Sequence, residues 1–150
     1  MKYIAHRGLT QGPSKELENN PSQLIKTISQ GYYVEVDAWF ADGEWMLGHD
    51  EPVYGVNQNF LDNEYMYVHA KNIDALHLLV QSKMSCKYFW HQEDDCVLTS
   101  NGYIWTYPGK QLTPSSIMVM PEYVDSTLAN TEGVNCYGIC SDYVAFLSNK

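Results

Sequence analysis

The sequence predicts an α/β fold built on parallel strands. Residues 2–8 form a short apolar run, residues 21–31 have the pattern of a helix, and residues 33–38 alternate as a second strand. A strand–helix–strand unit has a right-handed crossover and parallel strands, so the carboxyl ends of both strands lie at one edge of the sheet. Side chains at the ends of these strands are therefore expected to meet.

The helix is marked at both ends. Asn20 is a typical N-cap residue, Pro21 suits the first helical position, and Gln23 completes a capping-box pattern. Gly31 marks the stop. These signals predict a helix that connects the first two strands.

The second strand carries two acids on one face. Val34, Val36 and Ala38 alternate with Glu35 and Asp37, and a period of two places both carboxylates on the same side. Neighbouring carboxylates repel unless a cation or a shared proton separates them. The pattern therefore predicts a divalent metal held by oxygen ligands.

A hairpin brings a histidine back to these acids. Asp42-Gly43 is a strong turn signal, and the chain after it returns through an apolar run to His49-Asp50. We expect the His49 imidazole to lie near Glu35 and Asp37.

The first strand ends abruptly in His6-Arg7-Gly8. A histidine carries protons near neutral pH, an arginine binds anions through a planar fork, and a glycine allows a sharp turn. This combination indicates phosphate chemistry.

The order of these motifs resembles that of the glycerophosphodiester phosphodiesterase family, within the phosphatidylinositol-phospholipase-C-like phosphodiesterases. The resemblance runs from residue 4 to residue 50 and thins afterwards. It implies a TIM-type barrel, a catalytic pair of histidines, a metal held by acids and an arginine on the phosphate. Carried over, these roles fall on His6 and His49 as catalytic residues, on Glu18, Glu35 and Asp37 as metal ligands, and on Arg7 as a substrate-binding residue.

The third strand, residues 65–71, departs from the family pattern. The family has Glu-x-Lys at this strand end, whereas this chain has His69-Ala70-Lys71. Lys71 keeps a substrate-binding role towards phosphate, and His69 is either a nitrogen ligand to the metal or a plain strand histidine. The resemblance implies Mg or Ca as the ion, whereas imidazole suits Zn, Mn or Fe better.

The second half repeats short aromatic strands at residues 86–91, 102–107, 116–120 and 137–140. Trp105 and Tyr107 are candidates for substrate binding. If these strand ends reach the same mouth, the further pocket groups are His91, Glu93, Asp94, Tyr107, Glu122 and Asp142.

Connections between residues 100 and 117 are too short for crossover helices, which need a dozen or more residues. The strands either stay parallel in a barrel or form hairpins in an open α/β sheet. We predict a single domain over residues 1–150, a reduced TIM-type (β/α) barrel with several helices shortened to loops. A homodimer would cover apolar surface left bare by the missing helices.

Composition limits the partners. The formal net charge of −9 over 150 residues argues against nucleic acid and anionic membranes. An anionic diester therefore needs a local positive centre, which a metal, Arg7 and Lys71 would supply.

No signal peptide or membrane span is evident, which predicts a cytoplasmic protein. Buried free thiols are expected at the four cysteines, Cys86, Cys96, Cys136 and Cys140.

The predicted function is metal-dependent hydrolysis of a glycerophosphodiester to glycerol phosphate and an alcohol, with a histidine pair as acid and base. One alternative is a catalytically silent barrel that binds a phospho-ligand. Another is an enzyme that acts on phosphoglycerol-modified glycans.

Overall fold

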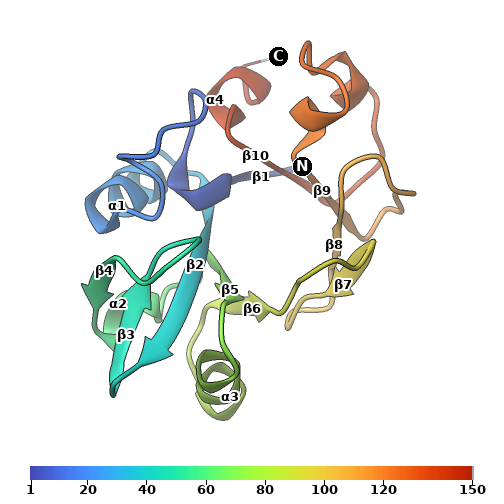
Figure 1. Cartoon of the computed structure of the whole chain (residues 1–150). Helices are drawn as coiled ribbons and strands as arrows, with labels where there is room; N and C mark the ends of the chain where they lie inside the picture. The colour runs from blue at the N-terminus through green and yellow to red at the C-terminus, as the bar shows by residue number, and fades with distance from the viewer. Residues whose placement is uncertain (150) are drawn as a thin grey trace.

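The computed structural model describes residues 1–149, which form one curled ten-stranded sheet with short helices around part of it (Figure 1). The strands are β1 (Lys2–Ala5), β2 (Tyr33–Ala41), β3 (Glu44–Leu47), β4 (Tyr54–Val56), β5 (Met66–Ala70), β6 (Lys87–Phe89), β7 (Cys96–Leu98), β8 (Ile104–Thr106), β9 (Ser116–Val119) and β10 (Gly138–Ser141). The α-helices are α1 (Pro21–Ser29), α2 (Gln58–Leu61), α3 (Ile73–Gln81) and α4 (Val144–Leu147), and short 3-10 turns are η1 (His6–Gly8), η2 (Pro121–Tyr123) and η3 (Ala129–Thr131).

Parallel pairing dominates the sheet. Parallel strands follow the order β6, β5, β2, β1, β10, β9, β8, while β3, β4 and β7 are attached in antiparallel fashion. The parallel strands all point the same way, so the segments that follow them meet at one rim. The prediction that β1 and β2 are parallel neighbours is confirmed.

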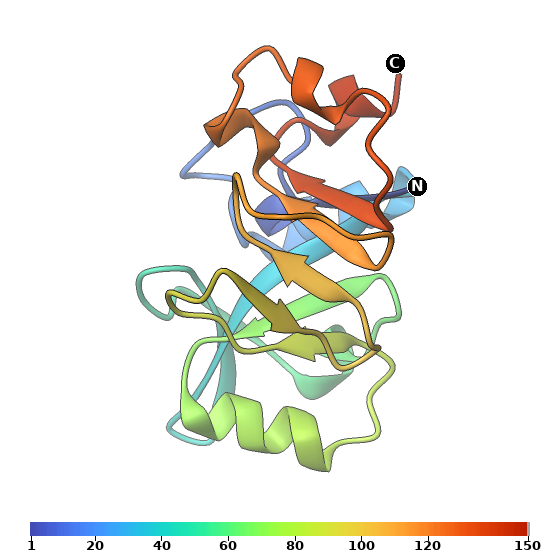
Figure 2. The ribbon, with the colours of Figure 1, turned by 90° about the vertical axis from the view of Figure 1, so that its right-hand side faces the viewer.

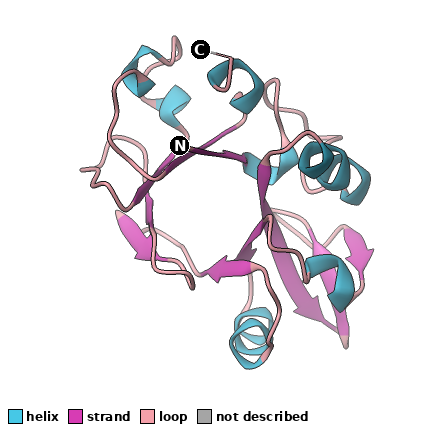
Figure 3. Cartoon of the chain, turned by 180° about the vertical axis from the view of Figure 1, so that it is seen from behind, coloured by secondary structure: helices cyan, strands magenta, loops and turns pink. Residues whose placement is uncertain are grey.

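The prediction of a reduced TIM-type barrel is wrong. The sheet curls but does not close, because β6 pairs only with β5 and β7 only with β8 (Figure 3). Residues 1–149 contain only four α-helices, of which α2 and α4 span four residues each. No helix lies in front of β7, β8 and β9 in Figure 2. The connections at residues 90–95, 99–103 and 107–115 are too short to hold crossover helices.

The gap between β6 and the β7–β8 turn is bridged by two hydrogen bonds. The backbone N–H of Ser100 donates to the carbonyl oxygen of Tyr88 at 2.9 Å, and the N–H of Tyr88 donates to Ser100 Oγ at 2.9 Å. These two bonds connect β6 to the β7–β8 turn, although β6 and β7 are not paired as strands.

The local signals at the N-terminal unit behave as predicted, with one exception. Asn20 caps α1 by accepting from the N–H groups of Ser22 and Gln23, and Asp42-Gly43 forms the β2–β3 turn with positive φ at both residues. The exception is the capping box, since the Gln23 side chain donates instead to the carbonyl of Gly8 at 3.0 Å. That bond ties α1 to the turn after β1.

The alternation on β2 separates core from site. Val34 and Val36 are fully buried in the larger apolar cluster, which includes Leu24 of α1 and Leu79 of α3. Glu35 and Asp37 point to the opposite face, inside the curl. All four cysteines are free, as expected, but the prediction that all are buried is wrong: Cys86 and Cys140 are buried, Cys136 is partly buried and Cys96 is exposed.

No helix among the described residues 1–149 combines the length and apolar character that a membrane crossing requires.

The turn that carries His49 depends on Gly48. A Cβ at Gly48 would lie 2.0 Å from the backbone oxygen of Glu51, whereas a Cβ at Gly43, also at positive φ, meets nothing within 4 Å. We expect Gly43→Ala to lower the free energy of unfolding by ~1 kcal/mol, the cost of left-handed backbone. Gly48→Ala should cost ~3 kcal/mol or more, because backbone must also move. Urea unfolding of both variants measures this, and equal losses would contradict the clash.

Candidate active site

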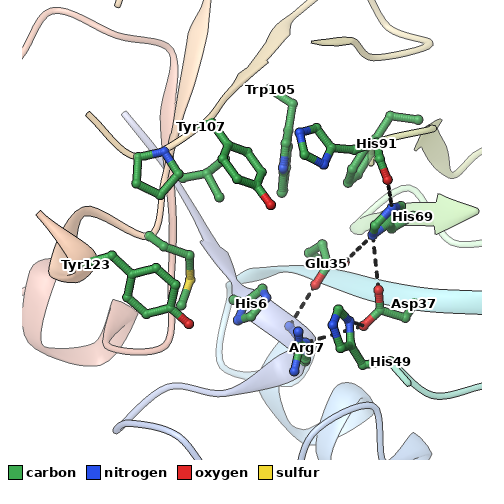
Figure 4. A pocket seen from close by; sticks show the side chains of 14 residues that line it. His6, Arg7, Glu35, Asp37, His49, His69, His91, Trp105, Tyr107 and Tyr123 are labelled. Carbon is green, nitrogen blue, oxygen red and sulfur yellow. Dashed lines mark hydrogen bonds and ion pairs between the residues drawn. The ribbon is translucent and has the colours of Figure 1, made fainter. Parts of the chain in front are cut away.

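One cavity of about 190 Å³ opens at the rim where the parallel strands end (Figure 4). Its charged and histidine-rich side is lined by His6, Arg7, Glu35, Asp37, His49 and His69, and its aromatic and apolar side by Phe89, His91, Trp105, Tyr107, Pro108, Val119, Met120 and Tyr123. The two sides come from different halves of the sequence.

A cluster of three ligand atoms lies on the charged side. Glu35 and Asp37 are almost fully buried, and the parallel register of β2 and β5 places His69 beside Asp37. Nδ1 of His69 is 3.1 Å from Asp37 Oδ1 and 3.9 Å from Glu35 Oε1, and one ligand atom from each residue lies within 4.8 Å of the others. The three residues together could hold a divalent cation.

The donor set supports this use. Glu35 Oε2 accepts the backbone N–H of Arg7 at 3.0 Å, but none of residues 1–149 donates a hydrogen bond to Glu35 Oε1. Because Glu35 lines the cavity, the oxygen that receives no donor is available there as a ligand to a cation. Two carboxylates and an imidazole nitrogen are common metal ligands.

Asp37 and Glu35 differ in their pKa shifts. Burial opposes ionisation of Asp37, but hydrogen bonds with His49, His69 and Asn19 outweigh it and lower its pKa well below the ordinary value. Burial and the negative charge of Asp37 raise the pKa of Glu35. One member of the pair is thus strongly ionised while the other resists a second negative charge.

Asn19 positions Asp37 and was missed as a site residue. Its side-chain amide donates to Asp37 Oδ2 at 2.9 Å and accepts the backbone N–H of Asp37 at 2.9 Å. The only signal in the sequence was its place directly after Glu18, since a buried asparagine in a loop has no periodic pattern.

Glu18 lies outside the cluster that the resemblance assigned it to. Its Oε2 accepts from Nη1 of Arg7 at 2.7 Å, and Nζ of Lys15 lies 3.1 Å from its Oε1. These bonds, stronger than the opposing effect of burial, lower the pKa of Glu18. Glu18 orients Arg7 here, and it does not join Glu35, Asp37 and His69.

Arg7 lies between the acids. Its φ of 51° turns the chain after β1, and Nε lies 3.4 Å from Asp37 Oδ2 while Nη1 binds Glu18. Burial opposes its charge, but the carboxylates of Glu35, Asp37 and Glu18 raise its pKa. The predicted anion-binding arginine therefore lines the cavity in charged form.

His6 is held by an acid from the end of β10. Its Nδ1 is 2.8 Å from Asp142 Oδ1, and the N–H of Asp142 and the Oγ of Ser141 both donate to Glu122 Oε1 at 2.9 Å. Burial lowers the pKa of His6, but the bond to Asp142 and the charges of Glu35 and Asp142 raise it by more. Asp142 therefore orients the His6 ring, and Glu122 in turn holds the backbone of Asp142.

His49 reaches Asp37 through a tightly held turn. The N–H of Gly48 donates to the Asp37 carbonyl at 3.1 Å, and Nε1 of Trp39 donates to the Gly48 carbonyl at 2.7 Å. The Nδ1 of His49 lies 3.2 Å from Asp37 Oδ2. The predicted approach of this imidazole is confirmed for Asp37.

The aromatic side is a series of stacked rings. Phe89 stacks on Trp105 with ring centroids 4.4 Å apart, and His91 stacks on Tyr107 at 4.2 Å. Trp105 is buried and Tyr107 is 40% exposed, so Tyr107 lies nearer the opening. Both candidate substrate-binding aromatics therefore line the cavity.

The remaining candidates lie at or beyond the edge of the site. Lys71 is not part of the cavity lining, but its Nζ is 3.7 Å from Asp37 Oδ1. Glu93 and Asp94 are exposed on the loop after β6, where only the Asp94 carbonyl contacts the site by accepting from His91 Nε2. Tyr123 also lines the cavity and was not predicted. It lies in η2, a short turn after β9, beyond the residues directly at the strand end.

Comparisons of the chain with protein families, with curated proteins and with solved structures gave no match. The resemblance of residues 4–50 to the glycerophosphodiester phosphodiesterases stays a prediction.

The His6–Asp142 pair predicts a measurable titration. Because the pair raises the His6 pKa above its ordinary value, its stabilising effect is full below that value and is lost as pH rises through the folded-state pKa. Asp142→Asn should lower the His6 pKa and reduce the free energy of unfolding more at acidic than at alkaline pH. Histidine NMR titration measures this, with the exposed His77 as internal reference. A His6 titration unchanged by the substitution would contradict the assignment.

Proposed function

We propose that the protein is a metal-dependent phosphodiesterase that hydrolyses a glycerophosphodiester-type substrate to glycerol phosphate and an alcohol. One observation carries the proposal. His6 and His49, each with Nδ1 held by a carboxylate, line a single cavity together with Arg7 and the cluster of Glu35, Asp37 and His69. The choice of a glycerol diester rests on the sequence resemblance.

Substrate binding falls to Arg7 and the metal. The chain has a formal net charge of −9, so an anionic substrate needs concentrated positive charge at the cavity. Nη1 of Arg7 is used by Glu18, while Nη2 has no hydrogen-bond partner among residues 1–149. That nitrogen is available to a phosphate oxygen, with Lys71 nearby to reinforce the field.

The metal site would consist of Glu35, Asp37 and His69. A bound divalent ion supplies Lewis-acid stabilisation of charge on the phosphoryl oxygens. Asn19 and the strand pairing hold Asp37 in place before any ion binds. The protein therefore provides a preformed set of ligands.

Proton transfer falls to the two histidines. With Nδ1 of each ring held by a carboxylate, Nε2 is the nitrogen left for the substrate, and Nε2 of His49 also lies 3.7 Å from Oδ1 of the exposed Asp50. One histidine takes a proton from the nucleophile, either water or a substrate hydroxyl beside the phosphate. As the bond from phosphorus to the leaving oxygen breaks, the other histidine protonates the alkoxide. When water attacks, this step gives glycerol phosphate and the alcohol directly, and the histidines return to their starting states by proton exchange with solvent. When a substrate hydroxyl attacks, the step gives a cyclic phosphate, which water then opens to glycerol phosphate as the two histidines exchange roles and are reset.

The aromatic side of the cavity favours a second candidate. Tyr107, which is 40% exposed, offers an aromatic ring near the opening, and the buried Trp105 lies deeper in the lining; an exposed aromatic ring suits a sugar. The same hydrolysis would then act on a phosphoglycerol-modified glycan. The leaving group, and not the chemistry, distinguishes the two substrates.

Activity tests the histidine pair. We expect metal-dependent release of glycerol phosphate from a panel of glycerophosphodiesters, reduced roughly 10²- to 10⁴-fold by His6→Ala and by His49→Ala. The control is His77→Ala, a change on the exposed side of α3. Full activity in either active-site variant would contradict the proposal. No turnover by the wild type, with phosphate ligands still bound, would indicate a silent phospho-ligand-binding protein.

Metal removal tests the cluster. An ion that binds only the folded protein at 100 times its Kd raises the free energy of unfolding by about 2.7 kcal/mol. We expect chelator to abolish this gain in the wild type and Asp37→Asn to prevent it. Asp42→Asn, an exposed change at the β2–β3 turn, should leave it intact. Thermal unfolding with and without metal measures the shift, and an equal shift in both variants would place the ion elsewhere.

A further inference from the structure

We infer that the cluster of Glu35, Asp37 and His69 selects a first-row transition ion, such as Mn²⁺, Fe²⁺, Co²⁺ or Zn²⁺, over Mg²⁺ and Ca²⁺, with Nδ1 of His69 as the selecting ligand. The inference rests on the metal site of the proposed function and narrows the ion that the site takes. It departs from the oxygen-only ligands that the sequence resemblance implies.

The tautomer of His69 can be assigned from its surroundings. Nε2 lies 3.0 Å from the backbone carbonyl oxygen of His91, and a carbonyl only accepts, so Nε2 carries a hydrogen. Nδ1 faces Asp37 Oδ1 at 3.1 Å and Glu35 Oε1 at 3.9 Å, and without a metal a proton on Nδ1 makes the hydrogen bond to Asp37. A divalent cation that displaces this proton meets the Nδ1 lone pair, because Nε2 keeps the hydrogen that it donates to the His91 carbonyl.

Three potential ligand atoms therefore converge in a largely buried place. Glu35 and Asp37 are 2% and 1% exposed, and none of the described residues donates to Glu35 Oε1. Converging acceptors are stable only with a cation or a proton between them. Two carboxylates balance the charge of a divalent ion, and a neutral nitrogen adds a third ligand without adding charge.

The His69 ring is held in this orientation from its other side. It stacks on Phe89 with centroids 5.0 Å apart and planes 13° apart, and its Nε2–H bond to a carbonyl is typical of metal-binding histidines. His91, which supplies the carbonyl, is fixed by its own Nε2 bond to the Asp94 carbonyl at 2.8 Å and by stacking on Tyr107. Nδ1 of His69 is therefore held in position before an ion binds.

Ligand chemistry then decides the ion. Mg²⁺ and Ca²⁺ are hard cations that take oxygen ligands, whereas imidazole favours Zn, Fe and their neighbours in the first transition row. A carboxylate at position 69 would make the cluster all oxygen. In this protein Nδ1 of His69 shifts the preference of the cluster from Mg²⁺ and Ca²⁺ towards transition ions.

Calorimetric titration of metal-stripped protein tests the inference without measuring activity. The background is Cys96→Ser, because Cys96 is an exposed thiol that could bind soft ions. We expect Mn²⁺, Co²⁺ and Zn²⁺ to bind more tightly than Mg²⁺ and Ca²⁺. His69→Asp should weaken Co²⁺ and Zn²⁺ by roughly 10- to 100-fold, the range seen when support of a metal ligand is lost, and spare Mg²⁺. The matched control is His77→Asp, which removes an exposed histidine.

Imidazole NMR of the wild type adds a readout that does not depend on a variant folding. On Zn²⁺ addition, Nδ1 of His69 should shift as a ligand while Nε2 keeps its proton. Equal affinity for Mg²⁺ and Co²⁺, or a protonated Nδ1 in the zinc-loaded protein, would overturn the inference but leave the proposed hydrolysis standing. Absence of binding by any ion would overturn the inference and the metal site together.

Discussion

Two carboxylates lie side by side, almost fully buried, on the inner face of β2, and most of the site is arranged around their charge. Asp37 is compensated by His49, His69, Asn19, Arg7 and Lys71, which come from four separate segments of the chain. Glu35 receives one backbone N–H and keeps one oxygen without a donor. This unequal compensation fits the cation that we propose at the pair.

The two halves of the sheet supply different surfaces to the cavity. The strands from β1 to β5 supply the charged side, with helices α1 and α3 covering their apolar outer faces. The strands from β6 to β9 supply stacked rings and carry no helices of comparable length. A phosphodiester has a charged centre and uncharged substituents, and the cavity offers a surface of each kind.

Several residues at the strand ends hold the histidines of the cavity in place. Asp142 holds His6, Glu122 holds the backbone before Asp142, and the His91 carbonyl sets the tautomer of His69. Each of these supports follows a different parallel strand at the common rim. The proposed proton transfer and the proposed ion choice therefore both depend on strand ends that are far apart in the sequence.

The sequence by itself determined the local features whose causes are local. The helix cap at Asn20, the turn at Asp42-Gly43 and the alternation that sets Glu35 and Asp37 apart from Val34 and Val36 each depend on residues a few positions apart. Tertiary structure alone decided that the sheet stays open, because pairing at β6 and β7 depends on distant strands and short connections. It also decided that Glu18 binds Arg7 and that His69 faces Asp37, since loop path and strand register, which no local pattern encodes, bring those charges together.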